Sequence, residues 1–190
     1  LDIFKLNYKK LDNPAKVAAA KIAEGKIIGW FQGREEFGPR ALGNRSIIAD
    51  PRSSNMKDKV NEIIKFREEF RPFAPSVIFE HAGDFFLNAY ESPYMTSTFK
   101  VKEDKKKVIP AVTHVDGTAR IQTVKEEENP IFYKLIKEFY EITGVPVVLN
   151  TSFNIKGDPI VNKPQQAIAT FFGSGMDCLF IGNYLVEKQN

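Results

Sequence analysis

Hydrophobic positions along the chain alternate between short apolar runs and longer stretches in which apolar residues recur every three or four positions. The short runs predict β-strands over residues 26–31, 45–49, 73–80, 94–102, 120–125 and 145–149, with two further short strands flanking Gly182. The longer stretches predict helices over residues 14–24, 55–66, 130–143 and 165–172. This alternation predicts a single α/β domain in which helices flank a twisted mixed β-sheet.

The helix over residues 130–143 has the clearest signals. It follows Asn129-Pro130, a typical helix start, and it ends at Gly144. Its apolar positions form a stripe that predicts a core-facing surface rather than a cofactor site; they are Ile131, Phe132, Leu135, Ile136, Phe139 and Tyr140. Two glycines and a proline predict that residues 35–44 form a loop.

Composition places the chain among globular domains. It has 190 residues, 43% of them hydrophobic, and 16 phenylalanines, enough for one well-packed core. The single cysteine, Cys178, lies in the apolar run CLFIG and is expected to be a small buried residue. No apolar run approaches the roughly 18–20 residues that span a bilayer, and no signal peptide is evident. The first residue is Leu1, so we expect a fragment of a longer cytoplasmic protein.

Arginine is concentrated in one part of the chain. Six of the seven arginines fall between residues 34 and 71, and the positive charge elsewhere comes mostly from twenty lysines. Arginine presents a rigid fork of donors that fits phosphate or carboxylate oxygens, whereas lysine is a mobile point charge. The cluster therefore favours an anion site over the alternative of surface pairing with nearby glutamates; its members are Arg34, Arg40, Arg45, Arg52, Arg67 and Arg71.

Several kinds of site are disfavoured. The chain has no phosphate-binding loop of the Gly-x-x-x-x-Gly-Lys-Ser/Thr type, so side chains would have to hold most of any phosphate. Two histidines and one cysteine make a closed zinc site improbable, and we assign no protein ligand to a metal. A net charge of +3 is too small to indicate nucleic-acid binding.

Two polar segments carry the remaining candidates. In KFREEFRPFAP, Lys65, Arg67 and Arg71 lie between a predicted helix and a predicted strand. In LNTSFNIKGDP, a polar cluster follows an apolar strand, where α/β sheets often bind ligands; it contains Asn150, Thr151, Ser152 and Asn154. The local pattern fits a turn that ends the strand equally well.

These segments resemble known motifs. Lys65-Phe66-Arg67 and Ser152-Phe153-Asn154 are similar to the Lys-x-Arg and Ser-x-Asn signature of YrdC-like domains. GREEFGPRALGNRSIIADPR, KFREEFRPFAP, PAVTHVDGTARIQTV and TGVPVVLNTSFNIKGDPIV resemble, in this order, the C-terminal domain of NodU/CmcH-type O-carbamoyltransferases. The resemblance covers residues 25–188, and Asp158 stands where that family is expected to have glutamate.

The resemblance implies a fold, a reaction and a set of partners. It implies that residues 1–190 form a YrdC-like domain, which converts carbamoyl phosphate and ATP into carbamoyl-AMP and releases pyrophosphate. A separate N-terminal domain of the same polypeptide, absent here, would pass the carbamoyl group to a hydroxyl acceptor. Magnesium is expected to be held mainly through phosphates and water. The oligomeric state stays open, with a homodimer as one alternative.

The same resemblance assigns residues to the site. Lys65, Arg71, Arg120 and Ser152 would act as catalytic residues on the nucleotide and the carbamoyl group, with Arg67, Thr151 and Asn154 beside them. Arg40 and Arg45, in GPRALGNR, are assigned to anion contacts with carbamoyl phosphate. His114 would orient substrate, although a role in shaping the turn at Asp116 is an equal alternative.

Two other functions remain compatible with the short motifs. YrdC-like domains also occur in threonylcarbamoyl-AMP synthases and in proteins that bind RNA. The long GPRALGNRS and THVDGTAR segments favour carbamoyl transfer, and the modest charge disfavours binding through a broad basic face.

Overall fold

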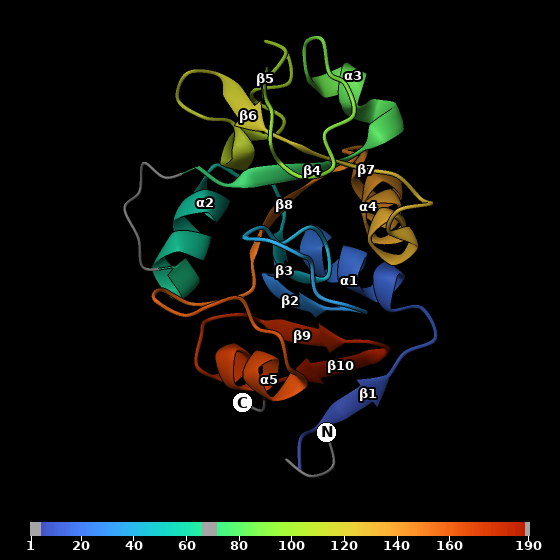
Figure 1. Ribbon diagram of the computed structural model, residues 1–190, viewed down its shortest axis with the longest axis vertical. Helices are drawn as coiled ribbons and strands as arrows, with labels where there is room; N and C mark the ends of the chain where they lie inside the picture. The colour runs from blue at the N-terminus through green and yellow to red at the C-terminus, as the bar shows by residue number, and fades with distance from the viewer. Residues whose placement is uncertain (1–4, 66–71, 189–190) are drawn as a thin grey trace.

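An eight-stranded mixed sheet forms the centre of the molecule (Figure 1). The computed structural model describes residues 5–65 and 72–188, with the backbone alone at Lys65. In spatial order the strands are β1 (Tyr8–Lys10), β10 (Tyr184–Glu187), β9 (Cys178–Ile181), β2 (Ile28–Phe31), β3 (Arg45–Ala49), β8 (Val147–Ser152), β4 (Ala74–Ile78) and β7 (Gln122–Val124). The pairs β2–β9 and β4–β7 are parallel, and the other neighbours are antiparallel. A separate two-stranded sheet pairs β5 (Thr98–Lys100) with β6 (Thr118–Arg120).

Five α-helices accompany the sheet in the part of the chain that the structure describes. They are α1 (Pro14–Ala23), α2 (Asn55–Val60), α3 (Ala82–Phe85), α4 (Pro130–Thr143) and α5 (Pro164–Phe172). Helices α1 and α4 pack against each other, α4 also contacts β4 and β8, and α5 contacts β2 and β9. This arrangement confirms the predicted α/β fold with a mixed sheet flanked by helices.

The start and end signals of the main helices act as expected. The side-chain oxygen of Asn13 accepts a hydrogen bond from the Lys16 amide at the start of α1, and Asn129 does the same for the Phe132 amide in α4. Helix α4 ends where Gly144 adopts a φ of 72°, a left-handed conformation that suits glycine.

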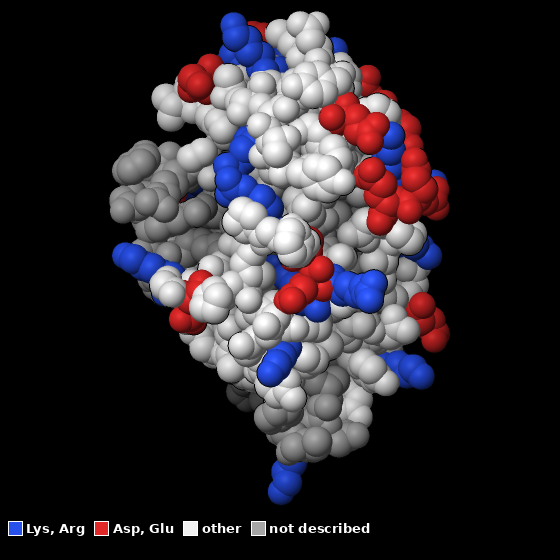
Figure 2. All heavy atoms as spheres, in the orientation of Figure 1, with Lys and Arg blue, Asp and Glu red and all other residues white. Residues whose placement is uncertain are grey.

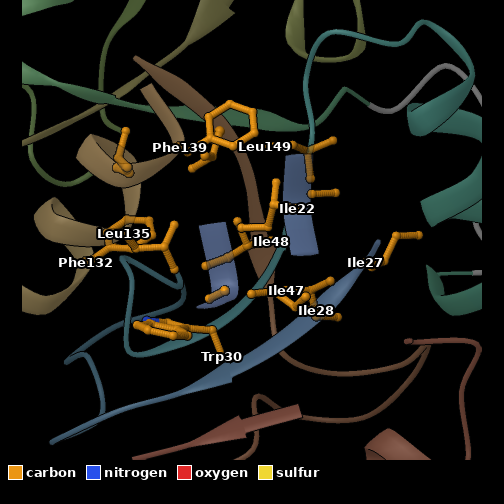
Figure 3. Packing of buried hydrophobic residues seen from close by; sticks show 14 of the residues in the cluster. Ile22, Ile27, Ile28, Trp30, Ile47, Ile48, Phe132, Leu135, Phe139 and Leu149 are labelled. Carbon is orange, nitrogen blue, oxygen red and sulfur yellow. The ribbon is translucent and has the colours of Figure 1, made fainter. Parts of the chain in front are cut away.

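The core lies between α1, α4 and the central strands. Figure 3 shows Ile22 of α1 and Phe132, Leu135 and Phe139 of α4 facing Ile48 of β3. These side chains are essentially inaccessible to solvent. The apolar stripe of α4 is therefore core, as its periodicity predicts.

Several predicted boundaries need correction. The strand predicted over residues 94–102 is limited to Thr98–Lys100, since Met95 has a φ of 55° and only three residues pair with β6. The strand predicted over residues 73–80 ends at Ile78, where a 3-10 helix (Phe79–His81) begins. The run predicted over residues 120–125 is divided between two sheets, at the end of β6 and in β7. Strand β1 was not predicted.

One correction affects the site. The strand predicted over residues 145–149 continues through Ser152, because β3 pairs with it as far as Ser46 opposite Ser152. Asn150, Thr151 and Ser152 therefore lie within β8, and only Asn154 follows its end.

The structure also bears on the expectations for Cys178 and for membrane-spanning segments. Cys178 is buried, and burial raises the pKa of its thiol to about 12, which fits a packing role. Within residues 5–65 and 72–188, every helix is too short or too polar to cross a bilayer.

Candidate functional site

Three adjoining hollows form a groove beside the loop that joins β2 to β3. Their volumes are about 360, 90 and 490 Å³. Arg40 lines all three, Arg120 lines the first two, and Ser152 lines the second and third. We call these hollows together the arginine groove, and its segments come from residues 35–41, the end of β6 and the end of β8. On the face drawn in Figure 2, basic side chains gather near the middle together with a few acidic ones, and a larger group of acidic side chains lies along the upper right edge.

The carboxylate of Glu36 fixes the base of the loop that carries Arg40. Its Oε1 accepts hydrogen bonds from the amides of Leu42 (2.6 Å), Asn44 (2.8 Å) and Arg45 (3.3 Å). Glu36 is therefore engaged by backbone donors, whereas sequence reasoning offered it as a surface partner for arginine. Arg40 lies at the exposed part of this loop and makes no ion pair with the described residues.

A buried polar network holds the same loop from the sheet side. Ser76 Oγ donates to Gln122 Oε1 (2.6 Å), and Gln122 Nε2 donates to the Leu42 carbonyl (2.8 Å). Asn150 Nδ2 lies within hydrogen-bonding distance of Ala41 O (3.2 Å), Ser76 Oγ (3.0 Å) and Gln122 Oε1 (3.1 Å). The network thus ties β4, β7 and β8 to the residues that directly follow Arg40.

Sequence reasoning missed Ser76 and Gln122. Ser76 is the one polar residue of β4 (APSVI), and Gln122 is a buried polar residue at the start of β7 (QTV). Buried polar groups need partners, so an isolated polar side chain in a strand of this kind is a usable signal for a hydrogen-bond network. The identity of the partners depends on strand order, which the sequence does not reveal.

Arg120 is positioned where the chain passes from the small sheet to the large one. Its Nε is buried and has no hydrogen-bond partner among the described residues. Burial lowers the pKa of its guanidinium, and the charge of Arg40 lowers this pKa further. Two arginines that share the 360 and 90 Å³ hollows, where no described lining residue is acidic, favour the binding of an anion.

His114 lies in the 360 Å³ hollow with a defined ring orientation. Thr118 Oγ1 donates to Asp116 Oδ1 (2.7 Å), so its oxygen is free to accept from His114 Nδ1 at 3.1 Å. Burial lowers the pKa of His114, and the positive charge of Arg120 acts in the same direction. The neutral ring with hydrogen on Nδ1 leaves Nε2 as an acceptor.

Ser152, the last residue of β8, and Asn154, which follows the strand, form a short hydrogen-bonded unit. Ser152 Oγ donates to Asn154 Oδ1 (2.7 Å), and Asn154 Nδ2 donates to the carbonyl of Asp158 (2.6 Å). Both residues line the 490 Å³ hollow, and Thr151 lines the 90 Å³ hollow. The structure therefore brings these three residues together with Arg40 and Arg120.

Arg45, another described arginine of the cluster, is held by the protein. Arg45 is 4% exposed, its Nη1 donates to Gln32 O (2.6 Å), and its Nη2 donates to Gly33 O (3.1 Å). Its guanidinium also stacks 3.6 Å from the centre of the Phe31 ring. Such bonding is typical of a structural arginine, so the anion contact predicted for Arg45 stays a prediction, although the residue lines the 490 Å³ hollow.

Comparison with known proteins decides the family. The sequence matches the family described as "Carbamoyltransferase C-terminus" over residues 19–188. The chain belongs to this family. It is 49% identical over 97% of its length to the nodulation protein NolNO of Sinorhizobium fredii, of which it covers 28%. It is 40% identical over 88% of its length to the 3'-hydroxymethylcephem-O-carbamoyltransferase of Amycolatopsis lactamdurans, of which it covers 32%.

Solved structures show the same fold. HypF, solved in a phosphate- and nucleotide-bound form, matches 90% of this chain with a TM-score of 0.63 and 16% identity, over 25% of the HypF chain. Sua5 of P. abyssi, complexed with L-threonine, matches 89% of this chain with a TM-score of 0.65 and 19% identity, over 46% of its own chain. The carbamoyltransferase C-terminal chain therefore has the YrdC-like fold of HypF and Sua5, and it spans about a third or less of the curated relatives that it matches.

Three predicted site residues of this family member are not placed by the structure. Arg67 and Arg71 lie outside the described residues, and only the backbone of Lys65 is described, at the end of the π-helical turn Asn61–Lys65. Pro72, the next described residue, lines the 360 and 90 Å³ hollows. The assignments of Lys65, Arg67 and Arg71 stay predictions.

The groove does not fit a magnesium ion held by protein carboxylates. Residues 5–65 and 72–188 contain no group of three or more His, Cys, Asp or Glu side chains that could hold a metal. Only Glu35 and Glu36 bring carboxylates to the described groove lining, and Glu36 already accepts three amide hydrogen bonds. Any magnesium bound in this groove would therefore have to take most of its ligands from a bound molecule and from water.

Proposed function

We propose that this domain activates a carbamoyl group with ATP. Carbamoyl phosphate supplies carbamate when water cleaves its phosphate as inorganic phosphate. A carbamate oxygen then attacks the α-phosphorus of ATP, forming carbamoyl-AMP as the bond to pyrophosphate breaks. An N-terminal domain beyond this chain would transfer the carbamoyl group to a hydroxyl, returning AMP.

The proximity of Arg40 and Arg120 in two hollows that no described acidic residue lines is the observation that carries this proposal. Both side chains line the same groove, next to Ser152 and His114. Phosphoryl transfer of this kind depends on positioning and on positive charge near developing negative charge more than on a covalent nucleophile. Family membership and the fold shared with HypF, which was solved with phosphate and nucleotide, support the choice of substrates.

Each side chain has a separate task in this proposal. Arg120 and Arg40 neutralise phosphate and carbamate oxygens, and the side chains of Lys65 and Arg71 add charge as predicted from the family motifs. Ser152 orients a phosphate oxygen, and His114 accepts a hydrogen bond through Nε2. Magnesium held by the phosphates of ATP would supply further neutralisation of phosphate charge.

Exchange of label between pyrophosphate and ATP tests the reaction directly. We expect exchange by the purified chain that requires carbamoyl phosphate and is unaffected by threonine and bicarbonate. Exchange that requires threonine and bicarbonate would instead identify a threonylcarbamoyl-AMP synthase, the alternative that the likeness to Sua5 favours. Absence of both exchanges, together with a salt-sensitive RNA complex, would favour an RNA-binding module.

The division of labour between domains gives a second test. The curated relatives are about three times longer than this chain, so we propose that acceptor carbamoylation needs residues outside it. The purified chain should bind ATP and support exchange without carbamoylating a hydroxyl acceptor. Acceptor carbamoylation by this chain alone would contradict the division.

A further inference from the structure

His114 is the one side chain that the described residues bring to the 360 and 90 Å³ hollows and that can take up a proton near neutral pH. Arg40 and Arg120 line both hollows, but a guanidinium is already protonated and only donates. The first step of the proposed reaction needs a proton acceptor beside the phosphate. Carbamoyl phosphate yields carbamate when water attacks its phosphorus, and that water loses a proton as the new bond forms.

A chain of hydrogen bonds that ends at Asp116 fixes the tautomer of the His114 ring. Hydrogen bonds from the hydroxyl and the amide of Thr118 lower the pKa of Asp116, so this side chain is a carboxylate and can only accept. The Thr118 hydroxyl therefore donates its proton to Asp116 Oδ1, at 2.7 Å, and it accepts from His114 Nδ1, at 3.1 Å. The neutral ring thus carries its hydrogen on Nδ1 and its lone pair on Nε2.

The lone pair on His114 Nε2 is available to a reactant in the 360 Å³ hollow. Nε2 has no hydrogen-bond partner among the described residues, and it is accessible to solvent, in contrast to Arg120 Nε. The ring lines the hollow while its Nδ1 is engaged by Thr118, so Nε2 is the polar atom that it offers there. Burial lowers the pKa of the ring; Asp116 opposes this effect, and the charges of Arg120 and Lys57 reinforce it. Nε2 is therefore unprotonated at neutral pH.

We propose that His114 is the general base of the step that forms carbamate. Nε2 takes a proton from water, the water oxygen bonds to the phosphorus of carbamoyl phosphate, and the bond from phosphorus to the carbamate oxygen breaks. Carbamate leaves with that electron pair, and the other products are hydrogen phosphate and an imidazolium. The imidazolium keeps its hydrogen bond to Thr118 and through it the stabilisation by Asp116, and it then releases its proton to water. The inference rests on the proposed function and adds a catalytic residue to it.

Two amide variants of His114 separate this role from the shaping of the turn. In His114→Asn the amide nitrogen takes the place of Nδ1 and can donate to Thr118, but nothing replaces Nε2. In His114→Gln an amide reaches the place of Nε2 but has no basic lone pair. Both variants should slow phosphate release from carbamoyl phosphate at saturating ATP by about 100-fold. Near-normal release by His114→Asn would overturn the inference, because the ring would then serve only the turn.

Carbamate supplied directly identifies the step that is lost. Freshly dissolved ammonium carbamate provides it without cleavage of carbamoyl phosphate, with ionic strength matched by NaCl. The loss of ATP–pyrophosphate exchange in both variants should be smaller by about tenfold or more with carbamate than with carbamoyl phosphate. Equal losses would overturn the inference and leave the proposed function standing. Exchange by the unsubstituted chain with carbamate but not with carbamoyl phosphate would also overturn the inference alone, whereas absence of exchange with either would overturn the proposed function as well.

The pH dependence of phosphate release tests the inference even if a variant does not fold. Burial holds the pKa of His114 below its ordinary value; of the charged groups around the ring, Arg120, Lys57 and Arg40 disfavour its protonation and Asp116 favours it. In the unsubstituted chain, kcat/KM should therefore fall with an inflection below about pH 6.5, as Nε2 takes up a proton. A flat profile between about pH 7.5 and 5, or the same fall in His114→Asn, would overturn the inference.

His81→Asn is the matched control. His81 lies beside Asp84 and lines none of the three hollows. We expect this variant to keep the rate of phosphate release and its pH dependence. A loss equal to that of His114→Asn would overturn the inference, because it would not depend on a base in the groove.

Discussion

The arginines at the two ends of β3 differ in whether an acidic side chain pairs with them. Beyond its carboxyl end, Arg52 donates to both carboxylate oxygens of Asp50, through Nε at 2.9 and 3.0 Å and Nη2 at 2.6 Å. Before its amino end, Arg40 shares the groove with Arg120, and neither forms an ion pair within the described part of the chain. Both ends belong to one arginine-rich segment, yet only one leaves positive charge without a counter-ion.

This difference separates structural arginine from arginine that is available to a ligand. At the Arg52 end, hydrogen bonding to Asp50 raises the pKa of the guanidinium, which indicates that the charge is stabilised by the protein itself. At the groove end, burial and the neighbouring Arg40 lower the pKa of Arg120. Repulsion between two like charges held close together costs free energy, and an anionic ligand bound between them would offset that cost.

Substitution of Arg120 should have the largest effect on this contrast. Loss of a charge-assisted contact costs about 1.5–3 kcal/mol, so Arg120→Ala should slow carbamoyl-phosphate-dependent exchange by about one to two orders of magnitude. Arg120→Lys should behave like Arg120→Ala, because lysine keeps the charge but loses the planar fork and the donor at Nε. Exchange rates at saturating ATP, with a thermal melt beside them, measure the effect.

Arg52→Lys is the control for that experiment. It makes the same chemical change in an arginine that faces Asp50, and its exchange rate should remain near that of the unsubstituted chain. Near-normal turnover of Arg120→Lys would contradict the paired-donor role. Loss of exchange in Arg52→Lys would show that the anion site lies at the Arg52 end of β3 and not in the groove.

Gly43→Ala should break the loop that keeps Arg40 in the groove. Gly43 has a φ of 108°, and a Cβ there would lie 2.2 Å from Cδ1 of Phe132, a fully buried ring of α4. Overpacking of this kind costs about 1–3 kcal/mol, and the backbone conformation adds to the cost. Urea unfolding should show a lower midpoint. Gly38→Ala, also at positive φ but with open space around its Cβ, separates the clash from the backbone effect.

Arg52→Ala should have a smaller effect, confined to stability. Asp50 is 6% exposed and would lose its bidentate partner, but the Arg52 side chain is about one-third exposed, so solvent weakens the pair. We expect a loss of about 1 kcal/mol in the free energy of unfolding, with exchange unchanged in the folded fraction. A loss of exchange without a loss of stability would contradict the structural role of this end.

The sequence predicted most of the fold because its signals are local. The caps at Asn13 and Asn129 and the glycine at 144 define helices whatever surrounds them, and the structure confirms both helices. Prediction failed where pairing with another strand decides the outcome. Strand β8 extends to Ser152 only because β3 lies beside it, and β1 forms by pairing with β10.

The candidate site could be predicted only in part for the same reason. Motifs indicated Arg40, Arg120, Thr151, Ser152 and Asn154, and the structure brings them to one groove. The same arginine-rich segment contains residues whose donors face carbonyls or Asp50, and nothing in the sequence separates these from Arg40. Hydrogen bonding between segments 28 to 109 residues apart made Asn150 the centre of a network, which no local pattern shows.

The smallest predicted effect is a pH dependence of stability that arises from His114. Its pKa is lowered in the folded protein, mainly by burial, so the unfolded chain takes up a proton first as the pH falls. The folded state should therefore lose stability as the pH drops below about 6.5, with no contribution from His114 above that value. His114→Gln should remove this part of the decline between about pH 7.5 and 5.5 in urea midpoints. His81→Gln removes the other histidine, which lies beside Asp84 away from the groove lining, and supplies the control. An equal change of slope in both variants, or none in His114→Gln, would show that the groove does not hold His114 in its neutral form.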